Sequence, residues 1–188
     1  MKRDERWMSL HRSKMTPYRV ACARALRGRI LDCGGGLGDY LPHLQGEIVL
    51  LDRTFDTLQM VQHPRRIVGD AEHLPFSENS FDSVWACAVA QYVHLDTFVS
   101  EVTRVTRPGG RALILVPNAK SPWDIIKKMF GMETWWDQEG IVKHYTVEDL
   151  RRYGRVTGEI QFLPAERYLR HLPILGHTLM LDIEVAKK

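Results

Sequence analysis

The sequence predicts a doubly wound, three-layer α/β domain with a mostly parallel sheet of seven strands, the last of them antiparallel. Two observations lead to this prediction. Short aliphatic runs, typical of strands covered on both faces, alternate with segments of helical periodicity. The first of these runs leads directly into a glycine cluster at 34–38, where the chain can turn sharply into a crossover connection. Such alternation favours one sheet with helices on both faces.

The predicted elements follow one another with short connections. Residues 5–27 favour helices, with a new helix starting near Tyr18 after Pro17 and ending at Gly28. We expect strands at 29–32, 48–52, 66–69, 81–87, 111–116, 159–163 and 177–185. We expect further helices at 39–46, 54–61, 95–106 and 146–153. Pro108-Gly109-Gly110 is expected to break the chain before the fifth strand, and Thr146 with Asp149 fits a capping box.

Composition limits the classes of function. The chain has 188 residues and a mild net charge of +3, which permits an anionic substrate but gives no strong nucleic-acid footprint. No apolar run approaches the roughly 20 residues that span a bilayer, and the N-terminus lacks the apolar stretch of a secretory signal. Cys22, Cys33 and Cys87 fit neither a disulfide framework nor a metal site. We therefore expect a cytoplasmic protein with no metal.

The glycine cluster has a spacing that distinguishes between nucleotide ligands. The pattern is D-x-G-x-G-x-G, formed by Asp32, Gly34, Gly36 and Gly38. The dinucleotide pattern G-x-G-x-x-G does not fit in either register. An acid at the mouth of the first strand would repel a pyrophosphate and attract an ammonium or sulfonium. A tight turn that holds no ligand is the alternative.

Asp52 ends the second predicted strand, 20 residues after Asp32. An acid at this place accepts hydrogen bonds from ribose hydroxyls in nucleotide-binding folds of this type. Alone, Asp52 would be read as an ordinary acid at a strand end. Together with the glycine loop it predicts a ribose site.

Four motifs occur in order: Ile30 to Gly38, Val49 to Arg53, Gly69 to Phe76 with Ser80 to Val84, and Arg107 to Arg111. With them the chain resembles the class I S-adenosylmethionine-dependent methyltransferases, which have a Rossmann-like fold. More narrowly, it resembles the small-molecule methyltransferases that include the ubiquinone and menaquinone biosynthesis enzymes. The resemblance covers residues 29–116.

The resemblance implies a site for S-adenosyl-L-methionine. Its positions are Asp32, Cys33, Gly34, Gly36, Gly38, Asp52, Arg53, Asp70, Ala71, Ala86 and Cys87. Asp32 and the glycine loop would hold the methionine part, Asp52 would bind both ribose hydroxyls, and Arg53 would lie beside the adenine.

The other implied contacts come from the third and fourth strands. Asp70 would accept from the adenine amino group, and the Ala71 N–H would bind the ring. Ala86 and Cys87 would pass near the sulfonium. The alternative for Asp70 is a capping acid after the third strand.

No catalytic base can be assigned from the sequence. Methyl transfer is an in-line displacement, and a base matters only when the acceptor carries a proton to be removed. Tyr92 stands where many relatives have a histidine, and His94 follows two residues later. His144 precedes the helix expected at 146–153. These three are the weak candidates: Tyr92 as a hydroxyl that orients the substrate, and His94 and His144 with a solvent-exposed surface position as the alternative.

The resemblance also suggests an organisation of one domain over 1–188. Its parts are a helical cap at 1–28, a cofactor-binding core at 29–116, a substrate lid at 117–146, and a helix with strands at 147–188. We expect Trp123, Ile125, Ile126 and Met129 to form the buried face of a lid helix, with an inner side that meets substrate. Contact with a membrane surface, helped by the neighbouring lysines, is the less favoured interpretation.

The predicted function is methyl transfer from S-adenosylmethionine to a small molecule of apolar or aromatic character. The alternatives are an RNA methyltransferase, a non-catalytic protein that binds the cofactor, and an NAD-dependent enzyme, which the glycine spacing disfavours. Nucleic acid and membrane are not expected partners. The acceptor atom and the oligomeric state stay open.

Overall fold

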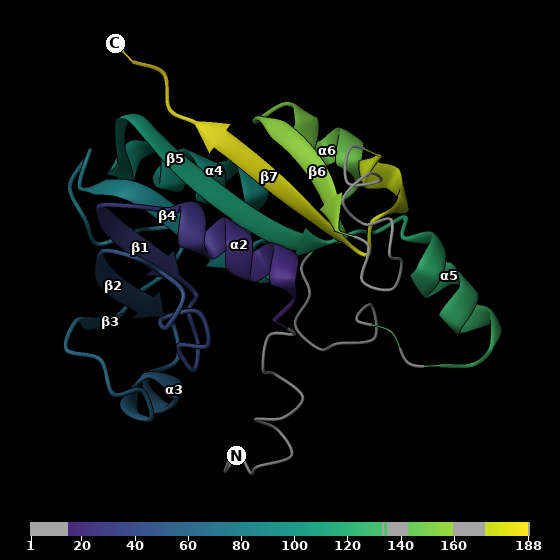
Figure 1. The fold of residues 1–188 in the computed structure, drawn as a ribbon, viewed down its shortest axis with the longest axis horizontal. Helices are drawn as coiled ribbons and strands as arrows, with labels where there is room; N and C mark the ends of the chain where they lie inside the picture. The colour runs from purple at the N-terminus through teal and green to yellow at the C-terminus, as the bar shows by residue number, and fades with distance from the viewer. Residues whose placement is uncertain (1–14, 133, 135–142, 160–171, 188) are drawn as a thin grey trace.

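A computed structural model describes residues 15–132, 134, 143–159 and 172–187. One seven-stranded sheet has the order β3-β2-β1-β4-β5-β7-β6 (Figure 1). Its strands are β1 (Arg29–Cys33), β2 (Glu47–Asp52), β3 (Arg66–Val68), β4 (Phe81–Cys87), β5 (Thr106–Pro117), β6 (Arg155–Glu159) and β7 (Thr178–Glu184). The helices are α2 (Pro17–Ala25), α3 (Phe55–Gln59), α4 (Leu95–Val105), α5 (Pro122–Met129) and α6 (Val147–Arg151), with single 3-10 turns η1 (Ala90–Tyr92) and η3 (Pro173–Leu175).

The strand directions confirm the predicted fold class. Strands β3, β2, β1, β4 and β5 pair in parallel, and β7 is antiparallel to both β5 and β6. The five parallel strands therefore end at one common edge of the sheet, which is where folds of this type place their ligands. We call this edge the carboxyl edge.

The two faces of the sheet carry different helices. Ile30 and Trp85 belong to a core that includes residues of α2, whereas Leu31 and Val84 belong to the core under α4 and α6. This follows from the alternation of side chains along a strand. The α4 helix buries its whole apolar stripe, including fully buried Phe98. Helices thus cover both faces, as a doubly wound fold requires.

Two predicted connections are wrong. No helix forms over 39–46, where the chain makes successive turns instead. The glycine-rich start and Pro42, which lacks an N–H, leave too short a segment for a regular helix. Pro108-Gly109-Gly110 does not break the chain, because β5 runs through it from Thr106. The pairing of β5 with β4 shifts register between Phe81 and Ser83, and Gly109 has φ +79°. Residues 108–110 therefore form an irregular part of the strand.

The remaining elements are close to their predicted places. Thr16 caps α2, and the capping box of Thr146 and Asp149 is present at the start of α6. β6 begins at Arg155, earlier than predicted, and residues 160–163 lie outside the described part, as do 5–14. Within the described residues, no helix has the length and apolar character needed to cross a membrane.

Candidate functional site

The sheet register brings the predicted acids to the carboxyl edge. Asp32 on β1 lies beside Leu50 of β2, and Asp52 ends β2 beside Val68 of β3. Asp32 also lies beside Trp85 of β4, whose side chain packs toward α2. Asp32 and Asp52 therefore share the face of the sheet that α2 and α3 cover, one strand apart.

The glycine loop turns between these two acids. Gly34, Gly36 and Gly38 all have positive φ, of +69°, +52° and +74°. Glycine adopts this conformation without the cost that a Cβ imposes. A Cβ on Gly34 would lie 2.1 Å from a methyl group of Val89, so the loop is packed against the segment after β4. A Cβ on Gly36 would meet nothing nearer than Asp52 Oδ2 at 3.9 Å, so the space in front of Gly36 is open.

Asp32 is a buried carboxyl with one oxygen that has no partner in the described part of the chain. It is 1% exposed, and its Oδ2 has no hydrogen-bond partner among the described residues. Burial raises the pKa of Asp32 to about 7, and repulsion from Asp52 and Asp39 adds to the rise. Such a group is costly to bury unless a cation or donor is supplied from outside the chain. Asp32 therefore fits a site for a positively charged ligand group.

Asp52 is held in a fixed orientation by the backbone. Its Oδ2 accepts from the Gly36 N–H at 2.9 Å, and its Oδ1 accepts from the Thr54 N–H at 2.8 Å. Each carboxylate oxygen can accept a second hydrogen bond. Because Asp52 is only partly buried, these remaining positions are available to the hydroxyls of a ribose.

Asp70 and Ala71 follow β3 at the same edge. Asp70 Oδ1 accepts from the Glu72 N–H at 2.9 Å, and this bond lowers the pKa of Asp70. Asp70 Oδ2 lies 3.3 Å from His73 Nδ1. Asp70 and Arg53 are exposed, whereas Ala71 is buried. Asp70 thus has the capping role that the sequence offers as the alternative, and its ionised side chain still reaches solvent.

The other predicted positions differ in what they can offer. Cys33 and Ala86 are fully buried in the core under α4, so only their backbone can meet a ligand. Burial raises the pKa of the Cys33 thiol far above its usual range. Cys87 lies on the α2 side and is partly exposed, with its Sγ 3.6 Å from the hydroxyl of Tyr40.

The sequence analysis did not identify the segment after β4, residues 88–89, which packs against the glycine loop. Ala88 has φ +59°, an unusual conformation for a residue other than glycine, and its N–H donates to Leu115 O at 2.9 Å. The next residue, Val89, fills the space beside Gly34. Tyr40, which is 4% exposed, packs its ring 4.8 Å from that of Trp85. No motif spacing signals these contacts, because they join segments distant in sequence.

The three weak candidates for catalysis differ in their exposure and in their partners. His94 lies at the start of α4 with its side chain 75% exposed, and its Nδ1 is 2.8 Å from Glu72 Oε1. Tyr92 is partly buried, and burial raises the pKa of its hydroxyl. His144 is exposed.

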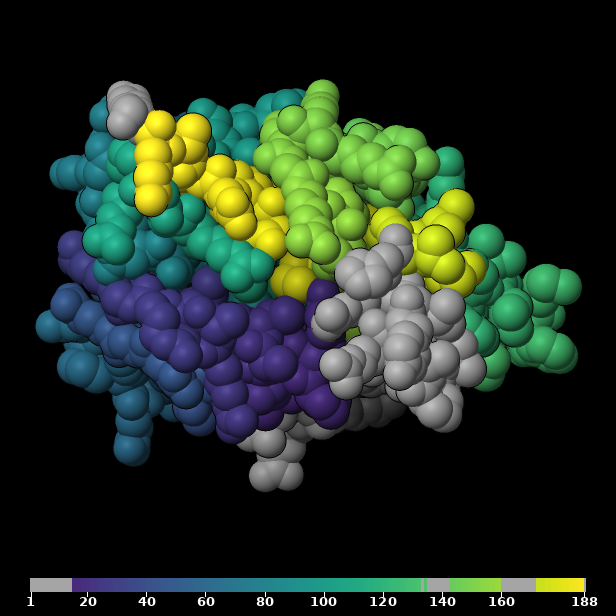
Figure 2. All heavy atoms as spheres, turned by 45° about the horizontal axis from the view of Figure 1, so that its top comes forward, coloured from purple at the N-terminus to yellow at the C-terminus, as the bar shows by residue number. Residues whose placement is uncertain are grey.

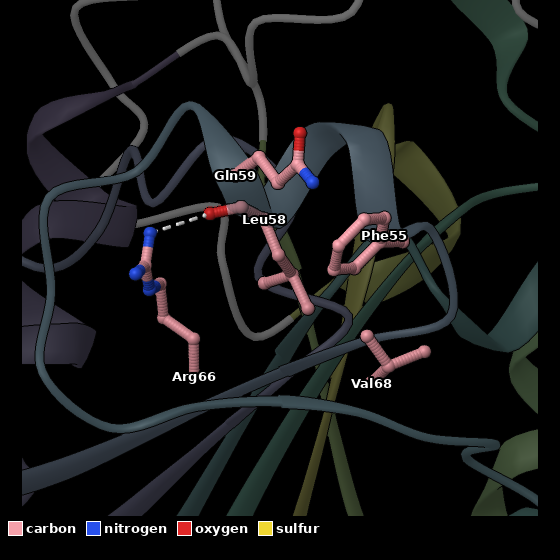
Figure 3. A pocket seen from close by; sticks show the side chains of 5 residues that line it. All are labelled: Phe55, Leu58, Gln59, Arg66 and Val68. Carbon is pink, nitrogen blue, oxygen red and sulfur yellow. Dashed lines mark hydrogen bonds between the residues drawn. The ribbon is translucent and has the colours of Figure 1, made fainter.

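A separate hollow lies beside the edge strand β3 (Figure 3). Phe55, Leu58 and Gln59 of α3 and Arg66 and Val68 of β3 line it. Within it, Arg66 Nη1 donates to Leu58 O at 3.0 Å (Figure 3). None of these residues is among the predicted cofactor positions, so this hollow is distinct from the site at the glycine loop.

The residues at the carboxyl edge fit the S-adenosylmethionine that the motifs imply. The unpartnered oxygen of Asp32 suits an ammonium, the open space at Gly36 admits a ligand close to the backbone, and Asp52 suits ribose hydroxyls. The fold is of the doubly wound class, and the residues at its carboxyl edge are those expected of a nucleoside-binding site.

Comparison with known proteins identifies the class more narrowly. Residues 31–114 match the family model described as a methyltransferase domain. This segment includes every predicted cofactor position. Over this segment the chain is similar to the class I S-adenosylmethionine-dependent methyltransferases, and among them to the ubiquinone/menaquinone biosynthesis group.

Individual relatives support this assignment over part of their length. The chain is 32% identical over 116 residues to a ubiquinone/menaquinone biosynthesis C-methyltransferase from Idiomarina loihiensis, covering 52% of this chain and 46% of the relative. It is 37% identical over 87 residues to a malonyl-(acyl-carrier protein) O-methyltransferase from Dechloromonas aromatica, covering 43% of this chain and 33% of the relative. The chain thus spans less than half the length of these two curated relatives.

A solved structure agrees with the fold. It is a complex of the Haloferax volcanii Trm112 methyltransferase activator with a methyltransferase. The likeness has a TM-score of 0.66 at 17% identity and covers 91% of this chain and 87% of the other. At this identity the comparison supports the architecture alone.

Proposed function

We propose that this chain binds S-adenosylmethionine at the carboxyl edge of the sheet and transfers its methyl group to a small-molecule acceptor. The observation that carries the proposal is the buried carboxyl of Asp32, which lacks a partner at Oδ2 beside an open glycine loop. A fold does not leave such a group uncompensated without cost, so a cationic ligand is the simplest explanation.

Each residue of the site has a defined task. Asp32 attracts the ammonium of the methionine part, and the loop around Gly36 admits it without a side chain in the way. Asp52, already oriented by Gly36 and Thr54, accepts from the ribose hydroxyls. When bound, the cofactor supplies an electrophilic methyl group for in-line displacement. The protein supplies position, orientation and exclusion of water.

An adenine site next to β3 completes the proposed contacts. Asp70 accepts from the adenine amino group, and the Ala71 N–H donates to the ring. Asp70 is ionised at neutral pH, as an aspartate normally is, and its lowered pKa favours the ionised acceptor at more acidic pH as well. Arg53 is exposed beside this region and covers the adenine edge.

The acceptor is proposed to be a small molecule with apolar or aromatic character. The names of two relatives specify ubiquinone/menaquinone biosynthesis and a malonyl-(acyl-carrier protein). Tyr92 is the residue best suited to orient such an acceptor. A tyrosine hydroxyl is protonated at neutral pH and can donate a hydrogen bond, and burial raises the pKa of Tyr92 further above neutral pH.

Calorimetry with S-adenosylmethionine, S-adenosylhomocysteine and NAD tests the cofactor. We expect micromolar binding of both adenosyl ligands and none of NAD. Asp52→Ala should weaken binding by about 100-fold, because it removes two hydrogen bonds to a charged acceptor. Asp56→Ala, which removes an exposed acid of α3, is the matched control and should leave affinity unchanged. Equal affinity of wild type and Asp52→Ala would refute the ribose site.

A second candidate function is non-catalytic binding of the cofactor. It is favoured by one observation: the side chain of His94 is 75% exposed, and its Nδ1 lies 2.8 Å from Glu72 Oε1, so this candidate base already has an acidic partner at the surface. A screen of aromatic and quinone-like acceptors with labelled cofactor distinguishes the two. Binding without transfer to any acceptor supports this second function. Salt-sensitive RNA binding would instead support the RNA methyltransferase that the sequence leaves open.

A further inference from the structure

The helix α5 does not form the buried lid face that the sequence predicts. Ile125, Ile126 and Met129 are 48%, 45% and 79% exposed, and only Trp123 of the expected face is partly buried. Figure 1 shows α5 projecting beyond the sheet, and Figure 2 shows its atoms standing out from the body of the molecule. Closer to the sheet, the segment after β4 offers a polar group instead, the side chain of Gln91.

Gln91 is a buried amide with an oxygen that the chain does not use. It lies in the single turn η1, is 2% exposed, and its Oε1 has no hydrogen-bond partner in the described part of the chain. Burial raises the pKa of the neighbouring Tyr92, and a side-chain hydrogen bond with Gln91 acts in the opposite direction. That sign is expected when the amide nitrogen donates to the phenolic oxygen. The nitrogen of the Gln91 amide is therefore bound to Tyr92, and the oxygen is left over.

A second buried amide shows how the chain pairs an amide that serves the fold. Asn118, which follows β5, is 1% exposed. Its Nδ2 donates to Gly176 O at 2.8 Å, and its Oδ1 accepts from the Lys120 N–H at 3.0 Å. A buried acceptor without a partner costs free energy, so native proteins pair nearly all of them. Gln91 Oε1 departs from that rule, and a donor supplied by a ligand would explain it.

Gln91 lies between the glycine loop and the end of the expected lid. Val89, two residues earlier, fills the space beside Gly34, so η1 begins against the glycine loop. On its other side, the Lys143 N–H donates to Gln91 O at 3.5 Å. A methyl acceptor has to lie between the cofactor and the residues that cover it, because transfer needs the two reactants in contact. Gln91 is placed in that region.

We propose that Gln91 Oε1 accepts a hydrogen bond from a hydroxyl or amino group of the methyl acceptor, and so selects acceptors that carry such a donor. An acceptor without this group leaves the oxygen buried and unpaired, and the protein binds it more weakly. The acceptor class is then an apolar or aromatic body that bears an O–H or N–H. The inference rests on the proposed function, because it takes the ligand beside η1 to be the methyl acceptor.

Pairs of probes that differ by one donor test the proposal. The pairs are phenol with anisole, 2-naphthol with 2-methoxynaphthalene, and aniline with N,N-dimethylaniline. Their dissociation constants are measured by ligand-observed NMR on the full chain, with and without S-adenosylhomocysteine. We expect wild type to bind the donor of a pair about tenfold more tightly than its methylated partner. Gln91→Met keeps the length of the side chain but removes the oxygen, and should reduce this preference to about threefold or less.

Two further variants separate recognition from a structural role. Gln91→Glu keeps a side-chain oxygen and should keep the preference for the donor. Asn118→Leu removes a buried amide that the chain itself pairs, so it should lower the melting temperature and leave the preference unchanged, whereas Gln91→Met should melt as wild type does.

Calorimetry with S-adenosylmethionine on the same preparations tests the cofactor site separately. Gln91→Met should retain the wild-type affinity, and a wild type that does not bind the cofactor would refute the proposed function. The assignment of Gln91 would be overturned by a wild type that binds the cofactor but none of the donor probes, or that binds both members of each pair equally. An undiminished preference in Gln91→Met would overturn it as well.

Discussion

Two buried carboxylates on the same face of the sheet, Glu159 and Asp32, differ in the partners that the chain gives them. Glu159 at the end of β6 is 1% exposed, and its Oε2 accepts from Arg19 Nε of α2 at 2.6 Å. Thr16 donates to its other oxygen, and Arg19 also donates to Thr178 at 2.6 Å. Asp32 at the end of β1 is equally buried, yet its Oδ2 has no partner in the described residues.

The difference teaches how to separate a structural acid from a binding acid. Where a buried carboxylate serves the fold, the chain supplies its own cation and hydroxyl. Where the chain supplies none, the compensating charge is expected from a ligand. Glu159 connects α2 to the C-terminal strands, whereas Asp32 lies beside the glycine loop with Oδ2 unpartnered in the described residues.

Breaking the ion pair of Arg19 and Glu159 should lower the stability of the protein most. Arg19→Ala leaves Glu159 buried and unpaired, and we expect it to lower the free energy of unfolding by about 3–5 kcal/mol. Urea denaturation followed by circular dichroism measures this loss. The double variant Arg19→Ala with Glu159→Ala should lose less than the sum of the two single variants. Additive losses would show that the pair does not act as a unit.

Replacing Asp32, the proposed binding acid, should instead leave stability unchanged or higher and lower the affinity for the ligand. Asp32→Asn removes a charge that the fold does not compensate, so the unliganded protein should be at least as stable as wild type at pH 8. Affinity for S-adenosylmethionine should fall about 100-fold, the loss expected for a charge-assisted hydrogen bond. Thermal melting and calorimetry on one preparation measure both. A destabilised variant with unchanged affinity would make Asp32 a structural residue.

The pH dependence sharpens the comparison further. The unfolded chain releases the Asp32 proton near its ordinary pKa of 3.8, and the folded chain releases it only near 7. The folded state therefore binds more protons between these values, and the contribution of Asp32 to stability falls as pH rises from about 4 to 7. Below pH 7 a cationic ligand must displace this proton, so affinity should rise about tenfold per pH unit up to pH 7. Asp32→Asn should remove both dependences, and a flat affinity profile in wild type would contradict the assignment.

Removing the partner of an exposed carboxylate should change the stability of the protein least. Asp96 forms an ion pair with Arg152 at 3.0 Å, and both side chains are more than half exposed. Solvent screens this pair, so Arg152→Ala should change the free energy of unfolding by no more than about 0.5 kcal/mol. Urea denaturation in parallel with Arg19→Ala measures the contrast. A similar loss in both variants would mean that burial does not explain the difference.

The sequence indicates the proposed cofactor residues because they lie close together along the chain. Asp32, the glycines and Asp52 are recognised by spacing and by their place at strand ends, and the structure places them around one loop. The capping box at Thr146 was predictable for the same reason, since its partners are three residues apart. Local chemistry of this kind leaves a readable pattern.

Contacts between distant segments leave no such pattern. Arg19 and Glu159 are 140 residues apart, and nothing in either neighbourhood predicts that they meet. The outward face of α5 was also missed, because its periodicity shows amphipathic character without showing which side meets the protein. Pro108-Gly109-Gly110 has turn composition, yet sheet pairing with β4 and β7 overrides it.

The order of the strands also has a consequence for biosynthesis. β7 is the latest described strand in the chain, yet it lies between β5 and β6 and is the only neighbour of β6 in the described sheet. On the ribosome, the parallel strands emerge first and can pair, while β5 keeps a bare edge until β7 has been made. α2, although synthesised early, is fixed by Glu159 and Thr178 only at that late stage. We expect stalled nascent chains that end before Thr178 to be cleaved readily by protease, and chains of all 188 residues held on the ribosome by an added linker to resist it.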